Sequence, residues 1–286
     1  MLSTILLFCA LAFDESPVLL EQIRLDQAGF SCNTIDGVPG HKTDRARQLA
    51  PKDGASSPRQ PFRVETVTQA DLDSLVRIPT APADKAKLPR MGYETVREMF
   101  AERGHMSQRG LARLNPGVDW ERVTPGLKLL IPDFPPIEND LAAGKRKHRQ
   151  AELVRISLSR FEITAYDAGG RCIALFPCSI ARDKSKRPPE GELKVTTKIP
   201  RPNYTYSPDF VPRGQKPSKH ILMDGPNNPV GVAWIGLSIP TYGIHGTPQP
   251  ESIGNAESHG CFRLSNWNAA RLYAMVRPGT RVIVEQ

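Results

Sequence analysis

The pattern of apolar and polar positions changes about half-way along the chain. From residue 152 onward it has the period of two that is typical of half-buried strands: in the segment LVRISLS, Val154, Ile156 and Leu158 share one face. Five further segments have the composition of strands and are separated by Gly, Pro and Asp turns, namely FEITAYD, CIALFP, ELKVTT, KHILMD and WIGLSI. We therefore predict a mainly β domain over residues 152–286, a length that supports a core of its own.

One helix is expected near the end of this domain. Ser265 and Asn266 can cap a helix that runs to about Val276. Pro278 and the glycine after it end that helix, and the segment RVIVE closes the chain as a strand.

The N-terminal half has helical spacing instead. Val18, Leu19, Ile23 and Leu25 recur at the spacing of one helix face, and Gly29 follows where such a helix would end. The segment IDGVPGHKTDRARQLA then supplies a glycine turn and a second short amphipathic helix. Residues 13–50 are thus predicted to form a small helical unit, and residues 51–61 have the composition of a loop.

Residues 61–132 are predicted to form a second small unit of mixed α/β type. A helix is expected from Tyr93 to Phe100, and the segments LNPG and PGLKLLIP follow it. A generic helical hairpin is the alternative. Residues 133–151 contain two adjacent prolines and the basic run KRKHR, so we interpret them as a solvated linker.

The first residues suggest export. MLSTILLFCALAF is apolar but shorter than the roughly 20 residues that span a bilayer. It ends in the A-x-A pattern of a signal-peptidase site, so we predict a signal peptide over residues 1–12 and a periplasmic or cell-wall location. A lipid anchor on Cys9 and a buried N-terminal helix remain alternatives, and the membrane is expected as a partner only through an uncleaved leader.

The charge and the cysteines exclude some classes of protein. The chain has 38 Lys and Arg against 30 Asp and Glu, which favours anionic surroundings, but basic and aromatic residues do not alternate, so no nucleic-acid partner is expected. Without the leader, the remaining cysteines are Cys32, Cys172, Cys178 and Cys261. They form no dense framework and no C-x-x-C motif. Cys172 and Cys178 are expected in the core, and a disulfide between them stays open.

Candidate chemistry is concentrated in residues 240–266, PTYGIHGTPQPESIGNAESHGCFRLSN. A thiol attacks as its thiolate, and a free cysteine has a pKa of about 8.5, so Cys261 needs a base such as His245 or His259 nearby. Gly260 allows a substrate to approach the backbone, where the amides of His259, Gly260 and Cys261 can receive an oxyanion. A hydrogen bond from a ring nitrogen to a backbone carbonyl in the His245-Gly246 turn can orient the imidazole.

Two other interpretations of these residues stay open. His245, His259 and Cys261 could be three zinc ligands, although the helical histidine spacing and aligned acids of common zinc sites are missing. All three could also be buried structural residues, because a lone cysteine is commonly buried.

The segment H-G-T followed by S-H-G-C-F-R-L resembles the signature of the L,D-transpeptidase catalytic domain (the YkuD-type fold). The resemblance covers residues 152–286 and implies a YkuD-like β-sandwich. It implies that Cys261 is the nucleophile, that His245 is the base oriented by the Gly246 carbonyl, and that His259 shapes the pocket and oxyanion hole. It also implies that substrate contacts come from Ser258, from Arg263 (where the strict pattern has Asn), and from Tyr242 and Trp234.

Two weaker resemblances concern the N-terminal half. Leu25, Gly29 and Phe30, with IDGVPG after them, resemble half of a peptidoglycan-binding domain of the three-helix type. The LNPG and PG-x-x-L-x-IP segments resemble a LysM repeat, a β-α-α-β module for glycans that contain N-acetylglucosamine.

Together these resemblances imply a cell-wall enzyme whose partner is peptidoglycan. Cys261 would form a thioester with a tetrapeptide stem and pass it to an amine, giving a 3–3 crosslink or an attached protein, and carbapenems would acylate it. No metal or organic cofactor is implied. The alternatives are a non-catalytic wall-binding protein and an L,D-carboxypeptidase that transfers the stem to water.

Overall fold

The computed structural model describes residues 16–51, 60–142, 148–207, 219–258 and 260–286, without the side chains of 256–258. The predicted signal peptide, residues 1–12, lies outside the described residues. Across the part of the chain that is described, no helix is long and apolar enough to cross a bilayer.

The C-terminal half is mainly β, as predicted. Its central sheet has eight strands in the order β13-β11-β10-β7-β14-β3-β4-β5. In that order they are Phe262–Arg263, Gly243–His245, Ala233–Leu237, Gly191–Pro200, Arg281–Glu285, Leu153–Ser157, Glu162–Tyr166 and Cys172–Pro177. Two further strand pairs lie beside it, β12 (Ala256–Ser258) with β6 (Ile180–Ala181) and β8 (Tyr204–Tyr206) with β9 (His220–Leu222).

A single long strand joins the two halves of the sheet. The first part of β7, residues 191–194, pairs with β14, and the part from Val195 to Pro200 pairs with β10. The central sheet is therefore continuous through β7, whereas the expected sandwich would consist of two separate sheets. The predicted alternation in β3 holds from Leu153 to Ile156, because Val154 and Ile156 are fully buried while Leu153 and Arg155 are partly exposed; Ser157 departs from it and is buried.

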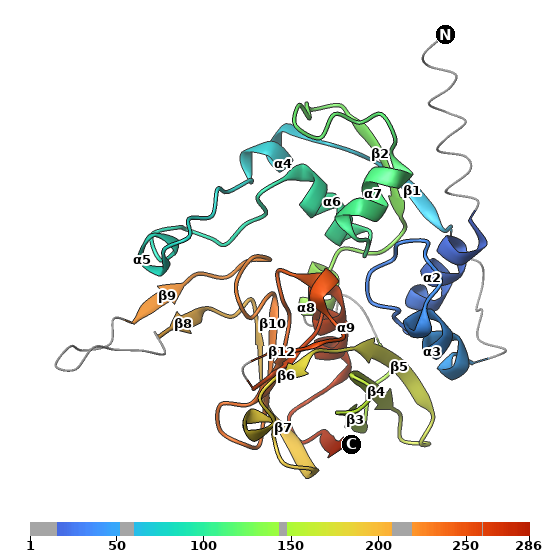
Figure 1. The fold of residues 1–286 in the computed structure, drawn as a ribbon, viewed down its shortest axis with the longest axis vertical. Coiled ribbons are helices and arrows are strands. Elements are labelled where there is room, and N and C mark those ends of the chain that lie inside the picture. Colours follow the sequence, from blue (N-terminus) through green and yellow to red (C-terminus); the bar gives the residue numbers. More distant parts are fainter. Residues whose placement is uncertain (1–15, 52–59, 143–147, 208–218, 259) are drawn as a thin grey trace.

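Helix α9 (Asn266–Met275) follows the predicted course and lies at the centre of the molecule (Figure 1). Its residues are almost all buried, including Asn266, Asn268 and Arg271 as well as Trp267. A helix against one sheet face would bury a single stripe. Here the sheet covers one side of α9 and the N-terminal half of the chain covers the other.

The first N-terminal unit contains two helices, as predicted. α2 (Pro17–Gln27) begins at the cap Ser16 and ends before Gly29, whose φ of 100° suits glycine. α3 (His41–Leu49) follows the glycine turn. The segment from Gly29 to Ser31 pairs with Leu175 on the outer edge of β5, so this unit extends the sheet of the C-terminal domain.

The second unit has a β-α-α-β core with two short helices inserted. β1 (Phe62–Thr66) pairs antiparallel with β2 (Lys128–Pro132), and the remaining elements are α4 (Gln69–Asp73), α5 (Pro82–Lys85), α6 (Val96–Arg103) and α7 (Gln108–Leu114). The helix expected from Tyr93 begins three residues later. Thr95 caps it, because its side chain accepts a hydrogen bond from the Glu98 amide at 3.1 Å.

Residues 133–151, predicted as a solvated linker, contain packed structure. Phe134 and Leu141 are buried, and the short helix α8 (Glu138–Leu141) packs against α9. The basic residues 145–147 lie outside the described residues. The prolines and charges of this segment indicated a linker, but its apolar side chains Phe134 and Leu141 belong to the core.

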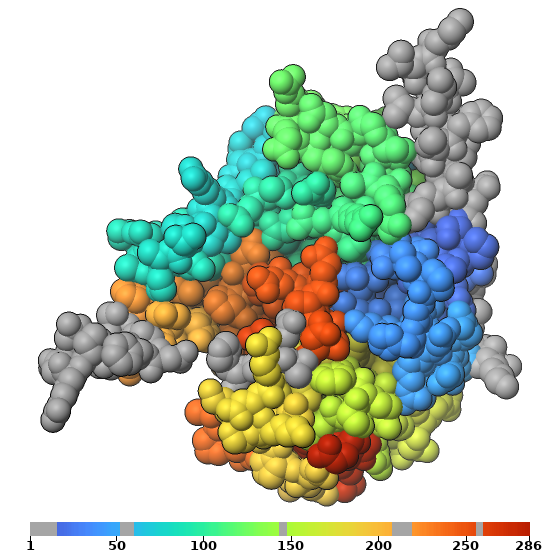
Figure 2. Space-filling model, viewed as in Figure 1, coloured from blue at the N-terminus to red at the C-terminus, as the bar shows by residue number. Residues whose placement is uncertain are grey.

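The three parts of the chain meet at one buried ionic cluster. Asp26 of α2 accepts hydrogen bonds from Arg271 of α9, whose guanidinium contacts both the backbone carbonyl (2.7 Å) and the carboxylate (3.2 Å). Nδ1 of His105, which follows α6, lies 3.0 Å from the same carboxylate. In Figure 2 the blue first unit and the green second unit lie directly against the C-terminal domain. The parts therefore form one packed body.

Candidate active site

Two parallel strands place the predicted base and nucleophile on one face of the sheet. β11 and β13 pair so that His245 lies beside Arg263. Cys261 is two residues before Arg263, and side chains two positions apart in an extended chain point to the same side. On the other side of β11, Trp234 of β10 lies opposite His245. The register of three strands thus brings Cys261, His245, Arg263 and Trp234 to a common face.

A cavity of about 550 Å³ opens on this face. Of the residues predicted from sequence, Cys261, His245, Gly260, Arg263 and Tyr242 all line it, as does Trp234. The remaining lining residues are Lys186, Tyr204, Tyr206, Ser207, Pro229, Val230 and Thr241. Among the described lining residues there are two cationic side chains and no acidic one, so the cavity favours an anionic ligand.

His245 is held as a neutral imidazole whose Nδ1 is bound to the backbone. Nδ1 lies 2.7 Å from the Gly246 carbonyl and donates to it, so Nε2 carries the lone pair. Burial lowers the pKa of His245 to about 4; the Gly246 hydrogen bond opposes this shift and the Arg263 charge adds to it. The Trp234 ring stacks on the imidazole at 5.6 Å between centroids, which limits its rotation.

Cys261 is a protonated thiol at rest. Its Sγ lies 3.5 Å from the Thr241 carbonyl, to which the thiol donates. Burial raises the pKa of Cys261, and a backbone hydrogen bond of Gly243 and the charge of Arg263 lower it only in part. When a neutral thiol and a neutral imidazole line the same cavity, reaction requires that the thiol proton be transferred as the sulfur attacks.

Residues 151–284 match the family model of the L,D-transpeptidase catalytic domain (YkuD). Curated relatives agree. The chain is 37% identical over 101 residues to YqjB of Bacillus subtilis, covering 34% of this chain and 51% of YqjB, so the match spans about half of that relative. It is 28% identical over 187 residues to YkuD of Bacillus licheniformis, covering 65% and 92%. Both relatives carry L,D-transpeptidase as a provisional name.

A likeness among solved structures is also found. An L,D-transpeptidase from Mycobacterium smegmatis aligns with a TM-score of 0.37 and 22% identity, over 48% of this chain and 59% of that one. The family model and the curated relatives support an L,D-transpeptidase catalytic domain in the C-terminal half.

Several residues that line the cavity were not predicted from sequence. Lys186 reaches the site from the connection between β6 and β7, and its carbonyl accepts a hydrogen bond from the Tyr242 hydroxyl at 3.1 Å. Thr241 adopts a φ of 70°, which is unusual for a β-branched residue. Tyr204 and Tyr206, on β8, also line the cavity. No local signal connects these residues with the motif, because their approach depends on the path of the loops.

Two predicted residues of the S-H-G-C segment fall outside what the structure describes. His259 lies outside the described residues, and the same holds for the side chain of Ser258. Their roles stay predictions, and so does the zinc alternative that includes His259. Across the described residues, no three His, Cys, Asp or Glu side chains gather as metal ligands.

Proposed function

We propose that this chain is a cysteine-dependent L,D-transpeptidase that acts on peptidoglycan stem peptides. The observation that carries the proposal is the cationic cavity lined by both Cys261 and a neutral His245 that Gly246 orients. The match of residues 151–284 to the L,D-transpeptidase family model supports the same reaction class.

In the acylation half-reaction, Cys261 attacks the carbonyl carbon of the peptide bond before the terminal D-residue of the stem. Nε2 of His245 takes the thiol proton as the sulfur–carbon bond forms. The backbone amides of Gly260 and Cys261, with that of His259, receive the developing oxyanion. When the intermediate collapses, the carbon–nitrogen bond breaks and the imidazolium returns its proton to the departing D-alanine amine. The stem is left as a thioester on Cys261.

In the second half-reaction, an acceptor amine attacks the thioester carbonyl and His245 removes the proton of that amine. The carbon–sulfur bond breaks, and the proton passes to the sulfur and restores the thiol. An amine on a neighbouring stem gives a 3–3 crosslink, an amine on a protein gives an attached protein, and water gives a trimmed stem. Lys186 and Arg263 supply positive charge for stem carboxylates.

We further propose that the enzyme acts outside the cytoplasm and that its N-terminal units contact glycan. The apolar leader with its A-x-A site supports export, and the β-α-α-β order of the second unit supports a glycan-binding role. Sedimentation of the full chain with insoluble peptidoglycan tests the second point. Equal sedimentation of an unrelated basic protein would contradict it.

The enzymatic proposal is tested by acylation followed by product analysis. A carbapenem should add its intact mass to the wild-type chain, and Cys261→Ala should show no adduct. Incubation with a defined disaccharide-tetrapeptide should then yield dimers and free D-alanine. Monomeric tripeptide alone would identify a carboxypeptidase. A folded wild-type protein that forms neither adduct nor product would refute the enzyme and leave the wall-binding alternative.

A further inference from the structure

The second N-terminal unit reaches the back of the catalytic site through one carboxylic acid. Glu102, on α6, is buried and accepts hydrogen bonds from Nδ2 of Asn266 at 3.1 Å to each of its two oxygens. The Tyr93 hydroxyl donates to the same carboxyl group at 2.9 Å. Asn266 is the first residue of α9 and lies three residues after Arg263, in the catalytic domain. A residue 164 positions away in sequence therefore holds this asparagine.

Asn266 also packs against the His245-Gly246 turn, which orients the imidazole. Its Oδ1 accepts a hydrogen bond from the Val232 amide at 3.2 Å, and its Nδ2 also donates to the Pro226 carbonyl at 3.0 Å. A Cβ added at Gly246 or at Gly231 would collide with Asn266 Oδ1. The side-chain amide thus lies directly against the backbone of Gly246, whose carbonyl accepts the Nδ1 proton of His245.

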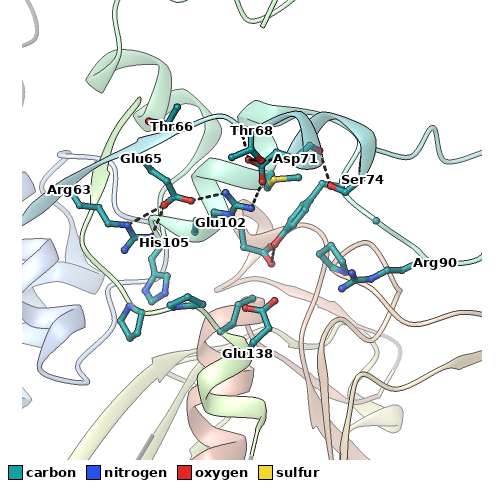
Figure 3. A pocket seen from close by; sticks show the side chains of 18 residues that line it. Arg63, Glu65, Thr66, Thr68, Asp71, Ser74, Arg90, Glu102, His105 and Glu138 are labelled. Atoms are coloured by element: carbon teal, nitrogen blue, oxygen red, sulfur yellow. Dashed lines mark hydrogen bonds and ion pairs between the residues drawn. The ribbon is translucent and has the colours of Figure 1, made fainter. Parts of the chain in front are cut away.

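Hydrogen bonds join the two units at this point. A second cavity, of about 610 Å³, adjoins Glu102, and its lining is mixed: charged residues of the second unit and Glu138 of α8 lie beside Tyr93, Met99, Ile137 and prolines. Arg103, the next residue on α6, makes ion pairs with Glu65 and Asp71. Figure 3 shows Glu102 between these two acidic residues and Glu138. Asn266 itself is fully buried, and its side-chain amide is held by the hydrogen bonds described above.

We propose that Glu102 is a positioning residue for catalysis: through Asn266 it fixes the Gly246 turn and so aims the His245 imidazole at Cys261. The proposal rests on the function proposed above for Cys261 and His245. It gives the second unit a part in the chemical step in addition to any contact with glycan. A shift of about 1 Å in such a group can cost on the order of 100-fold in rate.

The test compares Glu102 with a matched residue on the same helix and at the same junction. Glu98 accepts a hydrogen bond from Asn227 of the catalytic domain at 2.7 Å but does not touch Asn266. The full-length chain is used for Glu102→Ala, Glu102→Gln, Asn266→Ala and Glu98→Ala. For each we measure kcat and KM for D-alanine release, the pH–rate profile and the Tm.

Glu102→Ala should lower kcat about tenfold or more, with KM within about twofold, because the lost contact orients a catalytic group and does not bind substrate. The acid limb of its pH–rate profile should move toward the ordinary histidine range. Asn266→Ala should lower kcat by a similar factor. The double variant Glu102→Ala with Asn266→Ala should lose no more kcat than either single variant, because both substitutions break the same contact. Glu102→Gln, whose carbonyl oxygen still accepts from Asn266, should recover most of the rate. Glu98→Ala should keep its kcat although its Tm falls.

Equal losses of kcat in Glu102→Ala and Glu98→Ala would overturn the proposal, since the junction would then matter only for stability. A Glu102→Ala variant that keeps both kcat and its pH profile would also overturn it. If Glu102→Ala does not fold, the comparison of Glu102→Gln with Glu98→Ala decides in the same way. If the wild-type chain itself fails to react, the proposed function is refuted. That result is distinct from the outcomes above, which compare variants of an active enzyme.

Discussion

At the scale of single residues, the protonation states of Cys261 and His245 determine how the site can react. Papain-like sites start from a thiolate and an imidazolium, whose mutual charge lowers the cysteine pKa. Here burial acts on both groups and favours their neutral forms, while Arg263 lowers the pKa of each. Because Nδ1 of His245 is already committed to Gly246, Nε2 is a base that is ready at neutral pH.

The first prediction concerns the acid limb of kcat/KM. His245 must be neutral to accept the thiol proton, and its pKa is lowered to about 4. Activity should therefore persist as the pH falls through the ordinary histidine range and disappear only as it falls through about 4. Carbapenem acylation rates between pH 3 and pH 8 measure this limb directly.

A variant without the Arg263 charge serves as the control, because that charge contributes to the lowered pKa of His245. Arg263→Gln should move the acid limb to higher pH, because the imidazolium is then less disfavoured. A wild-type limb near pH 6.5 would mean that water reaches the imidazole in solution.

The second prediction uses the pH dependence of stability at Glu102. Burial raises the pKa of Glu102 from 4.5 to about 8, and the charges of Glu98 and Glu138 add to this shift. The hydrogen bonds from Tyr93 and Asn266 oppose it. The folded chain therefore retains a proton that the unfolded chain releases. The stability linked to it is complete below about pH 4.5 and is lost as the pH rises through about 8, with a slope of up to about 1.4 kcal/mol per pH unit.

Glu102→Gln removes this titration, so its stability should depend less on pH between 5 and 8 than that of the wild type. Urea unfolding at several pH values measures the difference. Parallel curves for the two proteins would show that Glu102 titrates in its ordinary range.

At the scale of elements, α9 connects the catalytic strands with both N-terminal units. Its first residue contacts the second unit, and Arg271, on its second turn, binds Asp26 of the first unit. Nearby, the Asn268 side chain donates to Ser31 at 3.0 Å, and the Trp267 ring stacks on His105. A helix with polar contacts on so many sides cannot shift without breaking several of them.

The third prediction tests the buried contact of α9 with α2. Burial tends to raise the pKa of Asp26, but the Arg271 guanidinium and His105 outweigh it and lower the pKa to about 2. Asp26→Asn leaves the buried Arg271 without a countercharge and should destabilise the fold by about 3–5 kcal/mol. Urea unfolding at pH 7 measures this loss.

The stability that ionised Asp26 contributes is present above its ordinary pKa of 3.8 and is lost as the pH falls through about 2. The difference in free energy of unfolding between wild type and Asp26→Asn should therefore narrow in that pH range. Asp84→Asn, which breaks an exposed pair with Lys87, is the matched control and should change stability little. Equal effects of the two substitutions would contradict a structural role for the buried cluster.

At the scale of the whole molecule, the sequence predicted what is local and missed what joins distant segments. The period-two pattern, the helix after Ser265 and the grouping of His245 with Cys261 follow from residues within about 20 positions of one another. The sequence did not indicate that Asp26, His105 and Arg271 meet, because each lies in a segment with its own regular pattern. For the same reason Lys186 and Glu102 were not predicted near the site: one lies in a loop and the other on a helix whose partner is remote.

The last prediction follows from this shared junction. If the N-terminal units were tethered by flexible linkers, they would unfold separately from the catalytic domain, as independent domains do. Here α9 belongs to the catalytic core and also carries the Asp26 and Glu102 contacts, so loss of either unit exposes buried polar groups of this helix. Calorimetry of the full chain should therefore show one transition with equal calorimetric and van't Hoff enthalpies. Asp26→Asn should move that single transition to lower temperature. Two resolved transitions would contradict the prediction, because they would show that the N-terminal units unfold independently of α9.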